Sequence, residues 1–145
     1  MGHDISSFDK KTIKEISYLR FSASSFVGQY LFYESLNAQC FNGGCSGTGE
    51  EKEYTVEEIK TAKAKLNYIL GEDNICDEIN AYSLDEKHDF FKLVFKLVMG
   101  SLGVDSDKEF GEKSKEEVEL YGKEINEFFD KIIESGETSV MIIFG

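Results

Sequence analysis

Apolar and polar residues follow two different rhythms along this chain, and each rhythm predicts a different kind of element. Residues 2–8 and 13–21 hold apolar and β-forming side chains on either side of the polar stretch 9–12, which predicts a β-hairpin. Five apolar residues in succession make residues 139–144 the last strand. Because a run that is apolar on both faces is typical of the inside of a sheet, we expect this strand to pair with the hairpin.

Helical spacing, with apolar residues three or four apart, predicts four helices. The first begins at an N-cap on Ser24 or Ser25 and ends near Asn37. Each of the other three follows a capping box, in which Ser or Thr stands three residues before a Glu. The boxes lie at residues 55–58, 83–86 and 114–117, and helix-ending glycines follow at Gly71, Gly100, Gly103 and Gly136.

The remaining segments complete the predicted topology. Residues 52–54 are expected to form a short strand, and residues 104–113 a polar loop. Helix 84–99 is apolar on nearly all sides, which is typical of a central buried helix or of an oligomer interface. Residues 1–145 are therefore predicted to form one α+β domain, in which about four helices pack on a small antiparallel or mixed sheet.

The charge of the chain narrows the classes of partner. Its 145 residues carry a net charge of −12, and Arg20 is the one arginine. Proteins that bind duplex nucleic acid need a basic stripe that displaces counterions from phosphates, so this class is disfavoured. An acidic surface keeps a protein in solution, faces a basic partner or mimics nucleic acid, and charge alone leaves these interpretations open.

The cysteines and the N-terminus indicate the compartment. Cys40, Cys45 and Cys76 make an odd count, and residues 1–9 are too polar for a signal peptide. No apolar run approaches the roughly 20 residues of a membrane span. We therefore expect a cytoplasmic protein with free thiols and no membrane partner. The spacing of Cys40 and Cys45 is not that of a zinc site, and no metal or cofactor is predicted.

The most distinctive local feature is the stretch 41–49, which holds glycines at positions 43, 44, 47 and 49. Successive backbone amides in such a loop can form an anion-binding nest. The spacing matches neither the dinucleotide fingerprint nor the phosphate loop, and the stretch follows a predicted helix. The alternative is a tight connection between a helix and a strand.

Three other features are candidates for chemistry, and each also has a structural explanation. Arg20, at the end of a predicted strand, suits a phosphate or carboxylate contact, or else a strand-edge ion pair. Phe90 and Phe91 could stack on a base, or else pack in the core. His3 and His88 have no motif partner, so we expect a structural or surface role for both and predict no catalytic residue.

Four segments resemble those of a group of small phage and prophage proteins. They are the starting run 1–5 (Met-Gly-His-Asp-Ile), residues 15–22, the loop 43–49 and the closing run 140–145. The group is similar to the anti-Thoeris family of phage sponges, which bind and sequester cyclic ADP-ribose signals made by bacterial TIR-domain immune enzymes. The likeness covers about residues 1–70 and the last strand.

This resemblance implies a phage or prophage anti-defence protein that binds a cyclic ADP-ribose or related cyclic nucleotide without cleaving it. It also implies a cytoplasmic homo-oligomer in which arginine holds the phosphates, a part that falls to Arg20. The ligand-binding residues that we expect are Arg20, Asn42, Gly43, Gly44, Ser46, Gly47, Thr48, Phe90 and Phe91.

Two other functions stay open at this stage. An acidic protein inhibitor, of the immunity or anti-CRISPR type, would block a basic partner enzyme and would cluster carboxylates on one flat, convex face. A hydrolase would hold a buried His or Cys with a shifted pKa in a cleft. A sponge would instead have a pocket lined by aromatic rings and loop amides.

Overall fold

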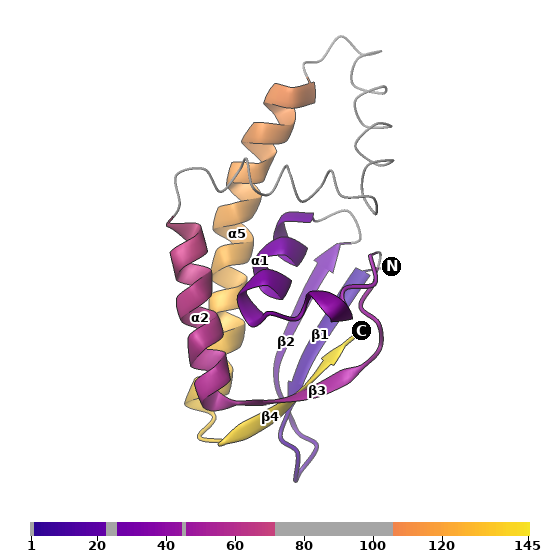
Figure 1. Ribbon diagram of the computed structural model, residues 1–145, viewed down its shortest axis with the longest axis vertical. Coiled ribbons are helices and arrows are strands. Elements are labelled where there is room, and N and C mark those ends of the chain that lie inside the picture. The colour runs from indigo at the N-terminus through magenta and orange to yellow at the C-terminus, as the bar shows by residue number, and fades with distance from the viewer. Residues whose placement is uncertain (1, 23–25, 45, 72–105) are drawn as a thin grey trace.

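The computed structural model describes residues 2–22, 26–44, 46–71 and 106–145 (Figure 1). It confirms the α+β class, with a four-stranded antiparallel sheet and three α-helices among these residues. The predicted helix 84–99 lies outside them. In chain order the elements are β1 (Gly2–Phe8), β2 (Glu15–Ser22), α1 (Phe26–Leu36), the 3₁₀ turn η1 (Gln39–Phe41), β3 (Glu51–Thr55), α2 (Val56–Leu70), α5 (Ser106–Glu134) and β4 (Ser139–Phe144).

Strand β1 organises the sheet, because it pairs with both β2 and β4. The strand order is β2-β1-β4-β3, and every pairing is antiparallel. Ile5 lies opposite Leu19 on one side and opposite Phe144 on the other, so the first and last segments of the chain are neighbours. The structure thus confirms the predicted hairpin and the predicted pairing of the last strand with it.

The hairpin turn is longer than the sequence predicts. The Asp9 carboxylate accepts hydrogen bonds from the Lys11 amide at 3.0 Å and from the Thr12 hydroxyl at 2.7 Å. Ile13, predicted as a strand residue, lies in this turn with a φ of 57° and a side chain that is 79% exposed. Because Asp9 holds these residues out of the ladder, β2 begins only at Glu15.

One face of the sheet carries the core. Alternate strand residues are buried on this face, and α1 and α5 pack against it. The Phe32 ring of α1 lies 5.9 Å from that of Phe21 in β2 and 6.3 Å from that of Phe144 in β4. Burial of such a side chain contributes roughly 1.5–3 kcal/mol. Nine of the 11 residues of α1 are buried, so α1 is a central helix of the described core.

Helix α5 begins earlier than predicted. It starts at Ser106, so the predicted loop 104–113 is wrong from that residue onward, and the capping box at 114–117 lies inside the helix. Four of the eight residues 106–113 are Lys or Glu, which are good helix formers, and a glycine such as Gly111 costs a helix interior only about 1 kcal/mol. Polarity alone therefore does not mark a loop here.

Helix α2 begins at the predicted capping box. The Thr55 hydroxyl accepts a hydrogen bond from the Glu58 amide at 3.2 Å, and the Thr55 amide donates to the Glu58 carboxylate at 3.3 Å. Together these bonds satisfy two donors that a helix N-terminus leaves open. The predicted apolar face of this helix is buried at Ile59, Ala62, Leu66 and Ile69.

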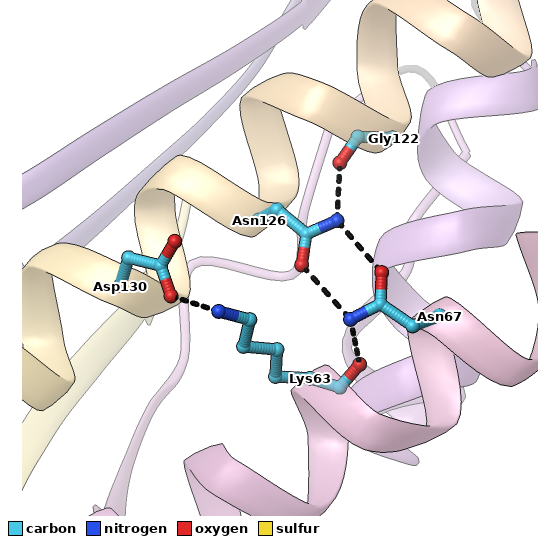
Figure 2. Close-up of polar contacts among 5 residues, drawn as sticks. All are labelled: Lys63, Asn67, Gly122, Asn126 and Asp130. Carbon is cyan, nitrogen blue, oxygen red and sulfur yellow. Dashed lines mark hydrogen bonds and ion pairs between the residues drawn. The ribbon is translucent and has the colours of Figure 1, made fainter.

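A ladder of polar contacts joins α2 to α5 (Figure 2). Asn67 and Asn126 each donate a side-chain hydrogen bond to the amide oxygen of the other, at 3.3 and 3.1 Å. Their amide groups also donate to carbonyls of their own helices, those of Lys63 and Gly122. The Lys63 ammonium forms an ion pair with Asp130. These contacts set the register of α5 against α2 and thereby position the side of α5 that borders β2.

Candidate functional site

Three segments meet at one end of the sheet: the start of β1, the end of β4 and the connection between η1 and β3. We call residues 42–49 the glycine loop. Asp4 and Gly145 exchange backbone hydrogen bonds of 3.1 and 2.9 Å. From the glycine loop, the Gly47 amide donates to the Gly145 carbonyl at 3.0 Å, and the Gly49 amide donates to the Phe144 carbonyl at 2.7 Å. The loop therefore closes this end of the sheet by extending the hydrogen bonding of β4.

Six amides of the glycine loop, all but that of Ser46 among its described residues, donate to protein acceptors. An anion-binding nest needs amides that point toward the ligand. The structure therefore favours the interpretation of a tight connection over that of a nest. Besides Gly47 and Gly49, the donors are Asn42 to the Gln39 carbonyl, Gly43 to the Ser46 carbonyl, Gly44 to the Asn42 side chain and Thr48 to the Phe41 carbonyl.

Close approach or a left-handed backbone favours glycine at several positions of this loop. A Cβ atom on Gly47 would lie 2.4 Å from the carbonyl oxygen of Phe144, so only a residue without a side chain can approach β4 this closely. Gly44 and Gly49 have φ values of 98° and 82°, which belong to the left-handed region that favours glycine. The glycines thus serve the close approach and the turns of the connection.

His3 fastens the glycine loop to the core. Its side chain is fully buried, Nε2 lies 2.6 Å from the Gly44 carbonyl oxygen, and Nδ1 lies 3.2 Å from the Tyr33 hydroxyl. A carbonyl only accepts, so Nε2 carries the proton and Nδ1 accepts from Tyr33. Burial lowers the pKa of His3, against smaller opposing effects of the Gly44 carbonyl and Asp4. His3 is therefore a neutral structural residue, as expected from the sequence.

The polar side chains of the glycine loop also bond within the loop or next to it. Asn42 is buried and accepts from the Gly44 amide at 3.0 Å. The Ser46 hydroxyl donates to the Gly47 carbonyl at 3.1 Å, and the Thr48 hydroxyl donates to Glu50 at 2.9 Å. These contacts show how the loop holds its own shape, and they leave its part in ligand binding as a prediction.

Arg20 lies on the edge strand β2, where its side chain is 62% exposed. Its Nε atom is 3.6 Å from the Asp4 carboxylate, which also accepts a hydrogen bond from the Tyr18 hydroxyl. The contact with Asp4 raises the pKa of Tyr18. The strand-edge ion pair that the sequence allowed is thus present, and it orients the guanidinium group across the sheet surface.

Arg20 also lines an open hollow of about 310 Å³ between β2 and α5. We call it the β2–α5 hollow. It combines two cations, two carboxylates and an aromatic ring over an apolar floor. Lys131 could not be assigned to a site from the sequence, because only the packing of α5 beside β2 brings it to this hollow, whereas Tyr18 precedes Arg20 by two residues on the same strand. The lining residues are Tyr18, Leu19, Arg20, Glu124, Glu127, Phe128 and Lys131.

The structure brings the predicted ligand-binding residues together only in part. Arg20 and the glycine loop lie at the same end of the sheet, because β2 ends where β4 ends. They flank β1, with Asp4 pairing to Arg20 on one side and to Gly145 on the other. Phe90 and Phe91 lie outside the described residues.

The outer face of the sheet, opposite the core, also offers an apolar surface. Phe8, Met141 and Ile143 are half-buried there and, with the exposed Ile13, line a shallow hollow of about 350 Å³. Charged residues border it, including Lys10, which forms an ion pair with Glu53 at 3.0 Å. This arrangement of an apolar centre and a charged rim is typical of protein interfaces.

Comparison with known proteins adds no assignment to this geometry. No protein-family model matches the chain, and no curated protein or solved structure matches it either. Within the described ranges, no group of three His, Cys, Asp or Glu side chains is placed to hold a metal ion. In the same part of the chain, no helix has the length and apolar character needed to cross a membrane.

The burial of His3 predicts a pH dependence of stability. The pKa of His3 in the folded protein lies below the ordinary value of 6.5. Just below pH 6.5 the unfolded chain therefore binds a proton at His3 more readily than the folded chain does. The free energy of unfolding should fall as pH drops below about 6.5, by up to about 1.4 kcal/mol per pH unit from this group. Urea titrations of wild type and His3→Gln from pH 5 to 8 measure it. Parallel pH profiles of the two proteins would contradict this account of His3.

The close approach of Gly47 to β4 predicts a large effect of one methyl group. Gly47→Ala should destabilise the fold by about 1–3 kcal/mol, because the clash is with backbone that cannot move aside. Gly71→Ala is the matched control, since Gly71 has a right-handed φ of −84° and room for a Cβ. It should be neutral or slightly stabilising. Equal denaturation midpoints for the two variants would show that the glycine loop does not pack as described.

Proposed function

We propose that this chain is a non-catalytic binding protein of phage or prophage origin that sequesters a cyclic ADP-ribose or related cyclic nucleotide signal in the bacterial cytoplasm. The observation that carries the proposal is the β2–α5 hollow, whose lining includes Arg20, Lys131 and Tyr18. The resemblance supplies the ligand class, and its segments 1–5, 43–49 and 140–145 interlock at the adjacent end of the sheet.

The side chains of the hollow suit the parts of such a ligand. Guanidinium and ammonium groups bind phosphate oxygens, and arginine does so with two parallel hydrogen bonds. The carboxylates of Glu124 and Glu127 can accept hydrogen bonds from ribose hydroxyls, and the Tyr18 ring can stack on a base. Two positive and two negative groups also make the hollow locally neutral in a chain of net charge −12, which limits repulsion of an anion.

The size of the hollow favours a homo-oligomer. A volume of about 310 Å³ is at the lower end of the range for small-molecule sites, and this hollow is open to solvent. A dinucleotide-sized ligand would be only partly covered there. We propose that a second copy of the chain covers the rest, which also fits the homo-oligomer that the resemblance implies.

A ligand-dependent rise in melting temperature tests the proposal. Purified protein is melted with cyclic ADP-ribose isomers and cyclic oligonucleotides, and a ligand well above its dissociation constant should raise the melting temperature by several degrees. The ligand should be recovered intact after heat denaturation, whereas a cleaved product would mean an enzyme. Arg20→Gln and Lys131→Gln should each weaken binding about tenfold or more, because each removes a charge-assisted hydrogen bond.

Lys123→Gln is the control for this experiment. Lys123 is exposed on α5 outside the lining of the hollow, and its replacement changes the net charge by the same amount. It should leave the affinity unchanged. Equal losses in all three variants would mean a general charge effect and not a site, and no shift with any nucleotide would reject the small-ligand function.

The outer face of the sheet favours a second candidate function, an acidic inhibitor that covers a basic partner enzyme. The apolar centre formed by Phe8, Met141 and Ile143 would supply the contact area, and the acidic chain would steer association. Such binding weakens sharply as ionic strength rises, and it needs the outer face instead of Arg20. Met141→Asp would abolish it while leaving nucleotide binding in place.

A further inference from the structure

The outer edge of β2, on the side away from β1, is open to a further strand. β2 is the first strand in the order β2-β1-β4-β3, so β1 is its one neighbour among the described strands. Residues 17–22 pair with β1 in six consecutive steps, and Ile16, which has no partner in β1, forms a bulge that ends this regular stretch. The far side of an edge strand carries backbone N–H and C=O groups that no strand satisfies. We call residues 17–22 the β2 edge.

The opposite edge of the sheet is protected against such pairing, and the β2 edge is not. β3 has only five residues, and Glu51, Lys52 and Glu53 are exposed along it. Short length and charge, that of Lys above all, keep an edge strand from pairing with another chain. Residues 17–22 contain neither Lys nor Pro, and their one charged side chain, that of Arg20, is paired with Asp4. Helix α5 leaves the β2–α5 hollow open instead of covering this edge.

The side chains of the β2 edge suit a second copy of the same edge. Ser17, Leu19 and Phe21 are buried on the core face, whereas Tyr18 and Arg20 are exposed on the outer face. We propose that β2 of a second copy pairs antiparallel with this edge about a two-fold axis, so that two four-stranded sheets join into one. The main chain supplies the pairing, and the side chains set its register.

The register follows from the two faces of the strand. An axis perpendicular to the sheet keeps the core faces on one side, and opposite residues then share a face, so the axis must pass through a residue. An axis through Arg20 would place that charge against its own copy, and an axis through Tyr18 would place the bulge at Ile16 opposite Arg20. An axis through Leu19 avoids both. It sets Tyr18 of each copy opposite Arg20 of the other, within reach of a cation–π contact.

Helix α5 runs antiparallel to β2 along the same side of the molecule. The Tyr121 ring lies 5.5 Å from the ring of Phe21, near the end of β2. Lys131, ten residues further along α5, lines a hollow together with Ile16, near the start of β2. The axis through Leu19 therefore passes near the middle of the α5 segment 121–131, and it brings each end of this segment toward the opposite end in the second copy.

The two ends of this α5 segment are complementary. Glu124 lies toward one end and Lys131 at the other, and both line the β2–α5 hollow, so the axis directs each Lys131 toward Glu124 of the other copy. Leu120, one turn before Glu124 on the same side of the helix, is 52% exposed. The axis directs it toward the bulge residue Ile16 of the other copy. Opposite charges and apolar groups thus meet across the axis, as an interface between identical surfaces requires.

This inference rests on the homo-oligomer part of the proposed function, to which it assigns an interface, and it requires no nucleotide. Sedimentation equilibrium of the full chain without ligand, at about 50 µM, should give a dimer. Leu120→Asp should raise the dissociation constant of the dimer about tenfold or more, because it places a charge in the apolar part of the interface. Tyr68→Asp is the matched control, since Tyr68 is 72% exposed on α2 and its replacement adds the same charge. It should leave the dimer unchanged.

Disulfide formation between two single-cysteine variants tests the register, in a background with Ser at positions 40, 45 and 76. In the proposed register, position 18 of one copy lies opposite position 20 of the other, with Cα atoms about 4.5–5.5 Å apart, which a disulfide can span. A mixture of Tyr18→Cys and Arg20→Cys should therefore cross-link on mild oxidation, and one Tyr18–Arg20 pair stays intact in the mixed dimer. Within either variant alone the two cysteines lie diagonally, about 7–8 Å apart, and should cross-link far less.

A monomeric wild type at this concentration overturns the inference, as does equal dimerisation of Leu120→Asp and Tyr68→Asp. A mixture that cross-links no faster than either cysteine variant alone overturns it as well. The two proposals can fail separately. A protein that stays monomeric but melts higher with a nucleotide would lack this interface and keep the nucleotide site. A dimer whose melting temperature no nucleotide raises would keep the interface and lose the nucleotide site.

Discussion

The pairing of β1 with β4 is the constraint on which the rest of the structure depends. These strands come from the first and last segments of the chain, and the sheet exists as a single unit only because they are neighbours. Their inner faces supply Ile5, Ile142 and Phe144 to the core, against which α1 packs. A contact between such distant segments closes a very long loop, which costs conformational entropy. We therefore expect β1 and β4 to pair only when burial of the core offsets that cost.

The glycine loop and His3 stabilise the pairing of β1 with β4. The loop adds hydrogen bonds to the end of β4, and His3 ties the loop to Tyr33 on α1. Three of the four segments of the resemblance therefore share a structural task, which is to hold one end of the sheet. Most of the described loop amides are committed to that task, and the β2–α5 hollow lined by Arg20, Tyr18 and Lys131, where we propose that the ligand binds, lies beside the loop.

Local patterns predicted much of the fold, because caps, turns and periodicity act over a few residues. The hairpin, the capping box of α2 and the last strand follow from such patterns and are confirmed. The start of α5 was hidden because Lys and Glu suit a helix as well as a loop. The roles of Gly47 and Lys131 were hidden for another reason. Their partners lie about 100 residues away along the chain, and no local pattern encodes that contact.

Amide hydrogen exchange tests most directly the central claim, that the glycine loop is a lock on the sheet and not an open anion site. In the protein without ligand, the amides of Gly47, Gly49 and Gly145 should exchange as slowly as those in the middle of β1, because they share the same cooperative unit. Exchange of these three amides at nearly unprotected rates would contradict the account. Protection of these amides that arises only when a nucleotide is added would contradict the account as well, because it would indicate that the nucleotide binds at the glycine loop.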